Sequence, residues 1–213
     1  ALTMTRGTAS YSEALRNDPQ GKWNFRVAPL VRRQKGLTFG VVGLGRIGLT
    51  AARRAAAFDM KVIFYDPCLP NGVDLATGYE RVRTLAELAR RSDIVSIHAP
   101  LSDETRGMIG RDFFAAAKDG MLLVNTARGP IIDLDALFAA LKSGKVGGAG
   151  IDVLPVEPAD PKYPLIAAFH KREAWLEGRL ILTPHAAFFS RRSTTCSGRR
   201  SRSASTTSGT ANL

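Results

Sequence analysis

Short apolar runs alternate with amphipathic stretches along most of the chain. The runs at 38–42, 61–65, 94–98, 121–125, 149–153 and 180–182 are predicted to be strands. Their apolar residues follow one another with little polar alternation, which is typical of strands buried on both faces. The stretches at 47–58, 85–90, 111–117 and 134–143 are predicted to be helices. Strands separated by helices predict an α/β fold of the Rossmann type, a doubly wound parallel sheet covered on both faces.

The first predicted strand leads into a glycine-rich turn. Gly43, Gly45 and Gly48 form a GxGxxG pattern between this strand and the first helix. The first glycine permits a sharp bend, the second lets a diphosphate approach the backbone, and the third lets the helix pack closely on the strand. Unpaired N–H groups at the helix start attract anionic oxygen. The pattern alone is weak, but its place between strand and helix predicts a dinucleotide site.

An acidic residue stands where the second strand ends. Asp66 directly follows the run at 61–65. A carboxylate in that place accepts hydrogen bonds from the adenosine ribose hydroxyls and repels a 2′-phosphate. We therefore expect the cofactor to be NAD rather than NADP.

Polar residues also gather where the later strands end. Parallel sheets bind ligands at the carboxyl ends of their strands, and His98, residues 125–128, Asp152 and His185 all fall there. Hydride transfer to or from a secondary alcohol needs a group that gives or takes a proton. Among the three histidines, His185 is the best candidate for that role. His98 could contact the cofactor or be a satisfied histidine at a strand end, and His170 lies in a polar stretch typical of a surface.

Composition sets limits on the class of protein. The 213 residues are 45% hydrophobic, with no apolar run near 18 residues, which indicates one sizeable domain with extra segments and no membrane partner. Cys68 and Cys196 lie far apart, so neither a disulfide framework nor a metal site is indicated. We expect a reducing, cytoplasmic setting.

The net charge of +11 is concentrated at one end. Five arginines fall in residues 191–213 and no acidic residue does, so the rest of the chain carries +6. The segment 190–213 is rich in Arg, Ser and Thr and is predicted to be disordered. Such a tail can bind nucleic acid nonspecifically, but a solvated or aberrant end is the favoured interpretation, and we expect no nucleic-acid partner.

The N-terminal residues have a weaker pattern. Residues 1–18 are compatible with a modest helix that ends near Asn17, Asp18 and Pro19. The first residue is Ala rather than Met. This start suggests a fragment or a processed product.

Three motifs in the second half of the chain resemble the D-isomer-specific 2-hydroxyacid dehydrogenase family. They are Val-Asn-Thr-Ala-Arg-Gly-Pro-Ile-Ile-Asp at 124–133, Gly-Ile-Asp-Val at 150–153 with Glu157 and Pro158, and Thr-Pro-His at 183–185. The order Arg, Glu, His behind a GxGxxG turn is specific, and the similarity runs from about residue 15 to residue 189. Residues 64–73 and 184–190 are similar to the branch of C-terminal binding protein. That branch has a tryptophan in place of Phe188, so we expect a bacterial-type enzyme rather than a transcriptional regulator.

The resemblance implies a role for each matching residue. Arg128 would pair with the substrate α-carboxylate and polarise the adjacent carbonyl. His185 would be the general acid in reduction and the general base in oxidation, with Glu157 bonded to it and favouring the imidazolium. Asp152 would contact the nicotinamide carboxamide. The other implied cofactor contacts are Arg46, Ile47, Ala99, Pro100, Thr105, Thr126 and Ala127, although Thr105 could instead cap a helix. No metal is implied.

The resemblance also implies that part of the family's architecture is absent. Residues 1–32 would be a remnant of the substrate domain with its linking helix and arm, and residues 33–189 would form the NAD-binding domain, expected to form a homodimer. Such a fragment would keep the cofactor site and the catalytic residues but turn over a small 2-keto or 2-hydroxy acid poorly. The alternatives are an NAD(H)-sensing module similar to the co-repressors and an inactive truncated product.

Overall fold

The computed structural model describes residues 1–18, 24–28 and 30–190. The predicted disorder of the Arg/Ser/Thr-rich segment therefore falls almost wholly outside the described residues. No helix in the described ranges is long and apolar enough to cross a membrane.

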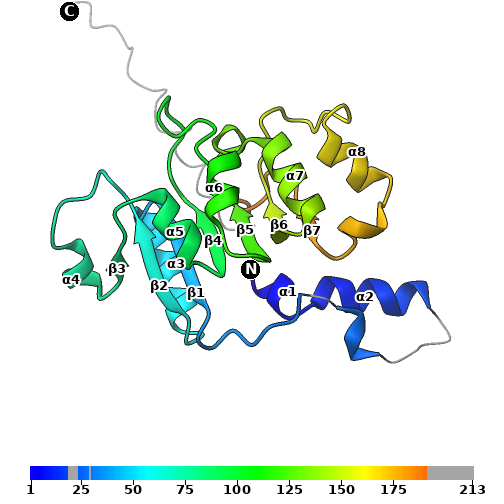
Figure 1. The fold of residues 1–213 in the computed structure, drawn as a ribbon, viewed down its shortest axis with the longest axis horizontal. Coiled ribbons are helices and arrows are strands. Elements are labelled where there is room, and N and C mark those ends of the chain that lie inside the picture. The colour runs from blue at the N-terminus through cyan, green and yellow to red at the C-terminus, as the bar shows by residue number, and fades with distance from the viewer. Residues whose placement is uncertain (19–23, 29, 191–213) are drawn as a thin grey trace, which may run out of the picture.

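Seven parallel strands form one sheet in the order β3-β2-β1-β4-β5-β6-β7 (Figure 1). Their bounds are Thr38–Val42 (β1), Lys61–Tyr65 (β2), Glu80–Arg81 (β3), Ile94–Ile97 (β4), Met121–Asn125 (β5), Val146–Ile151 (β6) and Leu180–Leu182 (β7). The strand order reverses at β1, which pairs with β2 on one side and with β4 on the other. This is the doubly wound order, and it confirms the predicted Rossmann-type α/β fold.

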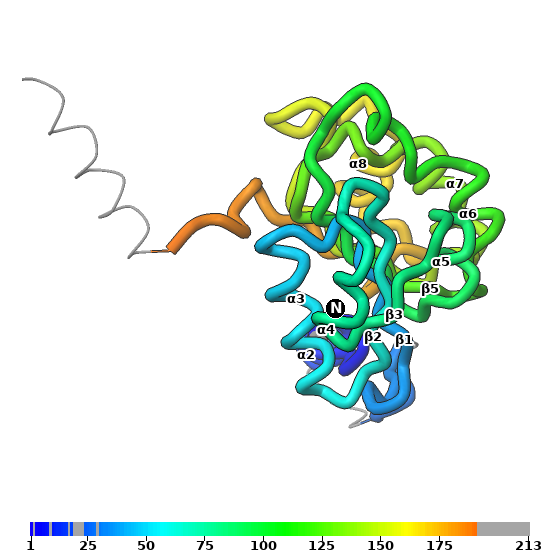
Figure 2. Tube along the Cα trace, turned by 90° about the vertical axis from the view of Figure 1, so that its left-hand side faces the viewer, coloured from blue at the N-terminus to red at the C-terminus, as the bar shows by residue number. Residues whose placement is uncertain are grey.

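Helices cover both faces of the sheet. They are α1 (Leu2–Thr5), α2 (Thr8–Asn17), α3 (Arg46–Ala56), α4 (Val73–Thr77), α5 (Leu85–Arg91), α6 (Arg111–Ala116), α7 (Leu134–Ser143) and α8 (Pro164–His170), with short 3-10 turns at Phe25–Val27, Gly129–Ile131 and Ala174–Leu176. Figure 2 shows α3 on one side of the sheet and α5, α6 and α7 on the other. Buried residues accordingly form two apolar clusters, one with α3 and one with α5 to α8. The predicted helix near the N-terminus is α2, which ends at Asn17 as expected.

The N-terminal segment packs on the sheet face that α3 covers. Met4 and Leu30 are 2% and 7% exposed and belong to the same apolar cluster as Phe39 of β1. The Arg32 guanidinium donates a hydrogen bond of 2.6 Å to the carbonyl of Gly120, just before β5. The assignment of residues 1–32 to a substrate-domain remnant stays a prediction.

Differences from the predicted elements occur where local sequence carries little signal. The runs at β1, β2, β5 and β7 and the helix α7 have the predicted bounds, and most other elements differ by one or two residues at an end. The strand β6 begins three residues before its predicted start, because glycines there have poor strand propensity and are required by packing. A Cβ on Gly147 would lie 2.6 Å from the carbonyl oxygen of Gly120, and one on Gly148 would lie 2.8 Å from Leu30. The short elements β3, α4 and α8 were not predicted.

Candidate functional site

In the glycine turn after β1, Gly43 and Gly48 are closely packed, whereas Gly45 faces open space. Gly43 has φ of +87°, and a Cβ there would lie 2.7 Å from the backbone nitrogen of Ala99. A Cβ on Gly48 would lie 2.0 Å from the carbonyl oxygen of Gly43, so only glycine lets α3 approach the turn this closely. A Cβ on Gly45 would meet nothing within 4 Å. The backbone at Gly45 is therefore open to a ligand, as a diphosphate site requires.

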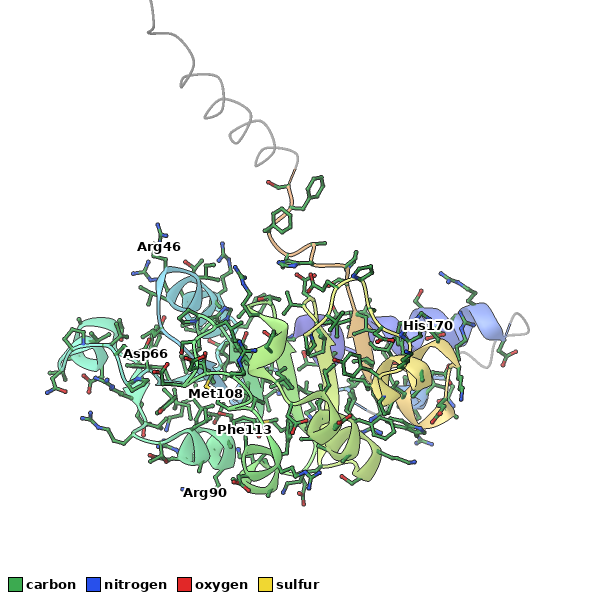
Figure 3. All side chains as sticks on the ribbon, turned by 90° about the horizontal axis from the view of Figure 1, so that it is seen from above. Arg46, Asp66, Arg90, Met108, Phe113 and His170 are labelled. Atoms are coloured by element: carbon green, nitrogen blue, oxygen red, sulfur yellow. The ribbon has the colours of Figure 1, made fainter. Side chains whose placement is uncertain are left out.

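A cavity of about 680 Å³ opens beside this turn. It is lined by Gly45, Arg46, Ile47, Thr50, Ala51, Arg54 and His98. The Arg46 side chain projects outward from α3 (Figure 3), and Ile47 is 73% exposed. Sequence reasoning missed Thr50 and Arg54, which follow Arg46 at intervals of four and therefore share its face of the helix. The cavity brings together the predicted diphosphate contacts.

Asp66 is tied to the glycine turn by its carboxylate. One oxygen accepts a hydrogen bond of 2.9 Å from the backbone N–H of Leu44, and the other accepts one of 3.0 Å from the N–H of Cys68. The side chain is half-buried directly after β2. It thus lies beside the turn, where the predicted ribose contact requires it.

His98 has a hydrogen-bond partner at the end of its strand and also lies beside the cavity, and its contact with a cofactor stays a prediction. Its Nε2 atom lies 2.9 Å from the hydroxyl oxygen of Ser96, and the ring also lines the cavity beside Gly45. Burial lowers the pKa of His98, because a low-dielectric environment disfavours the charged ring. A neutral imidazole is therefore present at this end of the site near neutral pH.

The segment after His98 forms a tight turn. Ala99 is buried against Gly43, whereas Pro100 is exposed. The Thr105 hydroxyl donates to the carbonyl of Pro100 at 2.7 Å and accepts from the N–H of Ser102 at 2.8 Å. Thr105 thus stabilises its own turn, and neither it nor Pro100 lines the cavity beside α3.

Asn125 shapes the turn that carries three predicted site residues. Its buried carboxamide accepts from the N–H of Ala127 at 3.0 Å and donates to the carbonyl of Arg128 at 2.9 Å. Thr126 is exposed and Ala127 is half-buried. The exposed Arg128 guanidinium donates a hydrogen bond of 2.6 Å to the carbonyl of Ala127. Arg128 is thereby held at the carboxyl end of β5.

Gly129 joins this turn to the loop that carries Glu157. A Cβ on Gly129 would lie 2.0 Å from the carbonyl carbon of Leu154 and 2.4 Å from the nitrogen of Pro155. The two backbones are therefore in direct contact. Arg128 and Glu157 belong to segments that pack against each other, although Arg128 does not line the cavity beside Glu157.

The structure brings Glu157 and His185 into contact. The Nδ1 atom of His185 lies 2.8 Å from the carboxylate of Glu157, whose other oxygen accepts from the N–H of Leu154 at 2.9 Å. The hydrogen bonds from His185 and Leu154 lower the pKa of Glu157, so it is a carboxylate at neutral pH. His185 has φ of +51° in the left-handed region, and its ring meets that of Phe188 edge-on at 5.8 Å.

Asp152 anchors the segment that carries His185. Its carboxylate accepts hydrogen bonds from the hydroxyl of Thr183 and from the N–H groups of Ala186 and Ala187, and its carbonyl accepts from the N–H of His185 at 2.8 Å. Burial acts to raise the pKa of Asp152, but these hydrogen bonds outweigh it and the pKa is lowered. Asp152 is only 4% exposed. Sequence reasoning predicted a nicotinamide contact here and missed this anchoring role.

A second cavity, of about 360 Å³, lies at this end of the sheet. It is lined by Asp152, Leu154, Glu157, Pro158, Ala159, Leu182, Thr183, Pro184 and His185. His170 is exposed in α8, at the end of the molecule opposite Arg46 and Asp66 (Figure 3), as its polar surroundings predicted. In the described ranges no group of three or more His, Cys, Asp or Glu side chains is placed to hold a metal ion.

Most of the chain matches one known protein family. Residues 1–187 match the model of the D-isomer specific 2-hydroxyacid dehydrogenase, NAD binding domain. The chain belongs to this family. The matched range includes the glycine turn, Asp66, Glu157 and His185.

Individual members of the dehydrogenase family match most of the chain. A glyoxylate reductase from Korarchaeum cryptofilum is 40% identical over 178 residues, which cover 82% of this chain and 51% of that protein. The crystal structure of a D-lactate dehydrogenase from Aquifex aeolicus, complexed with NAD and lactic acid, superposes with a TM-score of 0.75 at 30% identity and covers 94% of this chain and 60% of that one. The chain thus spans about half the length of such relatives.

The comparisons do not assign the chain to one branch of the family. C-terminal-binding protein 1 from Caenorhabditis elegans is 40% identical over 159 residues, covering 74% of this chain and 21% of that protein. The glyoxylate reductase has the same identity over a longer stretch. The expected closeness to the C-terminal binding protein branch is therefore not specific, and the comparisons support the dehydrogenase family as a whole.

Proposed function

We propose that this protein is an NAD-dependent D-2-hydroxyacid dehydrogenase that reversibly reduces a 2-keto acid to the corresponding 2-hydroxy acid. The observation that carries the proposal is the contact of 2.8 Å between His185 and Glu157 at the carboxyl edge of the sheet. A histidine bonded to a carboxylate is suited to general acid and base catalysis. The open backbone at Gly45, on the same edge, supplies the place for the cofactor.

The residues of the glycine turn fit a dinucleotide. The free backbone at Gly45 and the start of α3 would hold the diphosphate, and Arg46 would add a positive charge. Asp66 would accept hydrogen bonds from the ribose hydroxyls, which favours NAD over NADP. Ile47 and His98 line the same cavity and would contact the cofactor between these points. The bound nicotinamide would supply or accept the hydride.

The proton is handled by His185. Because its Nδ1 atom faces Glu157, the Nε2 atom is the one left to meet the substrate oxygen. In reduction Nε2 gives its proton to the carbonyl oxygen, and in oxidation it takes the hydroxyl proton. The Glu157 carboxylate orients the ring through its contact with Nδ1.

Arg128 would bind the substrate carboxylate. Its guanidinium is exposed at the end of β5 and, among the residues that the structure describes, donates one hydrogen bond, to the adjacent carbonyl of Ala127, which leaves most of its donors for a ligand. A planar guanidinium binds a carboxylate with two parallel hydrogen bonds. Relatives are named for glyoxylate and lactic acid, so we propose a small 2-keto acid as the substrate class.

Further cofactor contacts are proposed at Thr126, Ala127, Ala99, Pro100, Thr105 and Asp152. The proposed assembly is a homodimer.

A second candidate function is an NAD(H)-sensing binding module. The match to C-terminal-binding protein 1 at 40% identity favours it. In that case NADH would bind and promote dimerisation, but the nucleotide would not be consumed when a 2-keto acid is added.

The proposal is tested by titrating the purified chain with NADH, followed by fluorescence, and then adding glyoxylate or hydroxypyruvate while NADH absorbance is recorded. The dehydrogenase predicts binding followed by loss of NADH. His185→Gln should abolish the reduction and leave NADH affinity within about threefold, because His185 acts on the substrate. His170→Gln, at the far end of the molecule, is the control and should keep both. Preserved turnover in His185→Gln would contradict the role proposed for His185.

A further inference from the structure

Arg81 lies on the edge strand β3, next to the end of β2. It pairs with Phe64 of β2, two residues before Asp66, and the following residue donates its N–H to the carbonyl of Phe64 at 2.9 Å. The Arg81 side chain is half-buried. Its position brings the guanidinium beside the loop that follows Asp66.

The Arg81 guanidinium binds three backbone carbonyls of this loop. Its Nη2 atom donates to the carbonyl of Asp66 at 2.6 Å and to that of Leu69 at 2.9 Å, and its Nη1 atom donates to that of Pro70 at 3.1 Å. In the described part of the chain no carboxylate forms an ion pair with Arg81, and the neighbouring Glu80 is paired with Lys61 and Arg91 instead. One side chain thus fixes both ends of the loop at 66–70.

The fixed loop determines where the Asp66 carboxylate lies. One of its oxygens accepts from the N–H of Cys68, which lies inside the loop that Arg81 holds, and the other accepts from Leu44 of the glycine turn. If the loop moved, the contact with Cys68 would be lost and the carboxylate would be held by the N–H of Leu44 alone. A less restrained carboxylate binds less tightly, because binding must then restrict its motion.

We propose that Arg81 is a positioning residue for the adenosine end of the dinucleotide: by binding three carbonyls after β2, it holds Asp66 where the carboxylate distinguishes a ribose hydroxyl from a 2′-phosphate. The inference rests on the proposed NAD site and adds the residue that makes its selectivity effective. Arg81 acts through Asp66 and does not itself touch the cofactor.

The test compares the dissociation constants of NADH and NADPH, measured by fluorescence titration, in the wild-type protein and in Arg81→Gln. We expect Arg81→Gln to weaken NADH binding about tenfold, a loss typical of hydrogen bonds from a charged group. NADPH binding should change less, so that the preference for NADH falls. Arg83→Gln is the matched control, because Arg83 lies two residues after Arg81, carries the same charge and has an exposed side chain. Arg83→Gln should leave both dissociation constants within about twofold.

A double-mutant cycle separates positioning from a general structural role. In an Asp66→Asn background, Arg81→Gln should weaken NADH binding less than about twofold, because the side chain through which Arg81 acts is already changed. An equal loss in both backgrounds would overturn the inference. So would a larger loss for NADPH than for NADH, which would indicate that Arg81 binds a 2′-phosphate directly.

Failure of a variant to fold and failure of the wild-type protein to bind NADH have different meanings. If Arg81→Gln does not fold, as judged by thermal unfolding without nucleotide, Arg81→Lys replaces it, because an ammonium keeps the charge but lacks the planar set of donors. If the wild-type protein does not bind NADH, both the proposed function and this inference are wrong. If it binds NADH and the Arg81 variants bind equally well, only this inference is wrong.

Discussion

The Nδ1 atom of His185 lies 2.8 Å from the Oε2 atom of Glu157, 28 residues earlier in the chain. The two residues follow adjacent strands, β7 and β6, so the parallel sheet itself brings them together. The contact is the largest cause of the lowered pKa of Glu157. A change at His185 should therefore be visible in the pKa of Glu157.

The first prediction concerns the carboxylate of Glu157. In His185→Gln the pKa of Glu157 should rise toward its ordinary value of 4.5, because the main hydrogen bond that lowers it is lost while the bond from Leu154 remains. Titration of the side-chain carboxyl carbon by NMR measures this shift. His170→Gln should leave the titration unchanged. A Glu157 pKa that is the same in His185→Gln and in the wild-type protein would show that the contact does not exist in solution.

The second prediction concerns Asp152 and the pH dependence of stability. Its folded-state pKa lies below the ordinary 3.8, so its contribution to stability is full above about pH 4 and is lost as the pH falls through the lowered pKa. Asp152→Asn should reduce the free energy of unfolding by about 1–3 kcal/mol at neutral pH, because it weakens hydrogen bonds from three donors to a buried carboxylate. Urea denaturation at several pH values measures both effects.

The difference between wild type and Asp152→Asn is the informative quantity, because other carboxylates titrate in both proteins. That difference should shrink as the pH falls below about 4. Asp119→Asn is a suitable control, since the Asp119 side chain is almost fully exposed and makes one surface ion pair with Lys145. A difference that stays constant with pH would mean that the charge of Asp152 does not matter.

The third prediction contrasts two glycines of the turn after β1. Gly45→Ala should keep the fold, because a Cβ there meets nothing within 4 Å, but should weaken NADH binding by placing a methyl group where the diphosphate would approach in the proposed site. Gly43→Ala should instead lower the melting temperature, because its φ of +87° and its contact with Ala99 do not tolerate a side chain. Thermal unfolding and NADH titration of both variants test the contrast. Normal NADH affinity in Gly45→Ala would exclude the diphosphate position.

The fourth prediction concerns Arg179, just before β7. Its guanidinium donates to the carbonyls of Leu141, Val146, Gly147 and Trp175, at 2.7–2.8 Å. Burial lowers the pKa of Arg179. Arg179→Met should destabilise the protein by about 3 kcal/mol, because it leaves several carbonyls without a donor.

Arg179→Lys is expected to recover only part of this loss, since one ammonium cannot reach all four carbonyls. The exposed Arg83 again provides a control, and Arg83→Met should change the free energy of unfolding by less than about 0.5 kcal/mol. Chemical denaturation measures the free energy of unfolding of all three variants, which are compared if the dependence of that free energy on denaturant concentration is the same. Full stability of Arg179→Met would show that water replaces the guanidinium at no cost.

The sequence predicted the sheet well because buried parallel strands leave continuous apolar runs, as at Ile94–Ile97 and Met121–Asn125. It predicted the glycine turn because each glycine answers a local backbone requirement. The pairing of Glu157 with His185 came from the resemblance to a family, since nothing local relates positions so far apart. The roles of Arg81 and Asn125 were not predicted, because an arginine or an asparagine that binds distant carbonyls has no sequence signature.

The hydrogen bonds of Asp152 make it possible to observe whether the segment that carries His185 is in place. The N–H groups of Ala186 and Ala187 both point to this one carboxylate, while the described residues that follow β7, up to residue 190, extend away from the body of the protein (Figure 2). Exchange of these two amide hydrogens with solvent deuterium is therefore slowed only while the carboxylate holds them. Two backbone hydrogens thus act as a built-in reporter of whether His185 is in place, readable without cofactor, substrate or turnover.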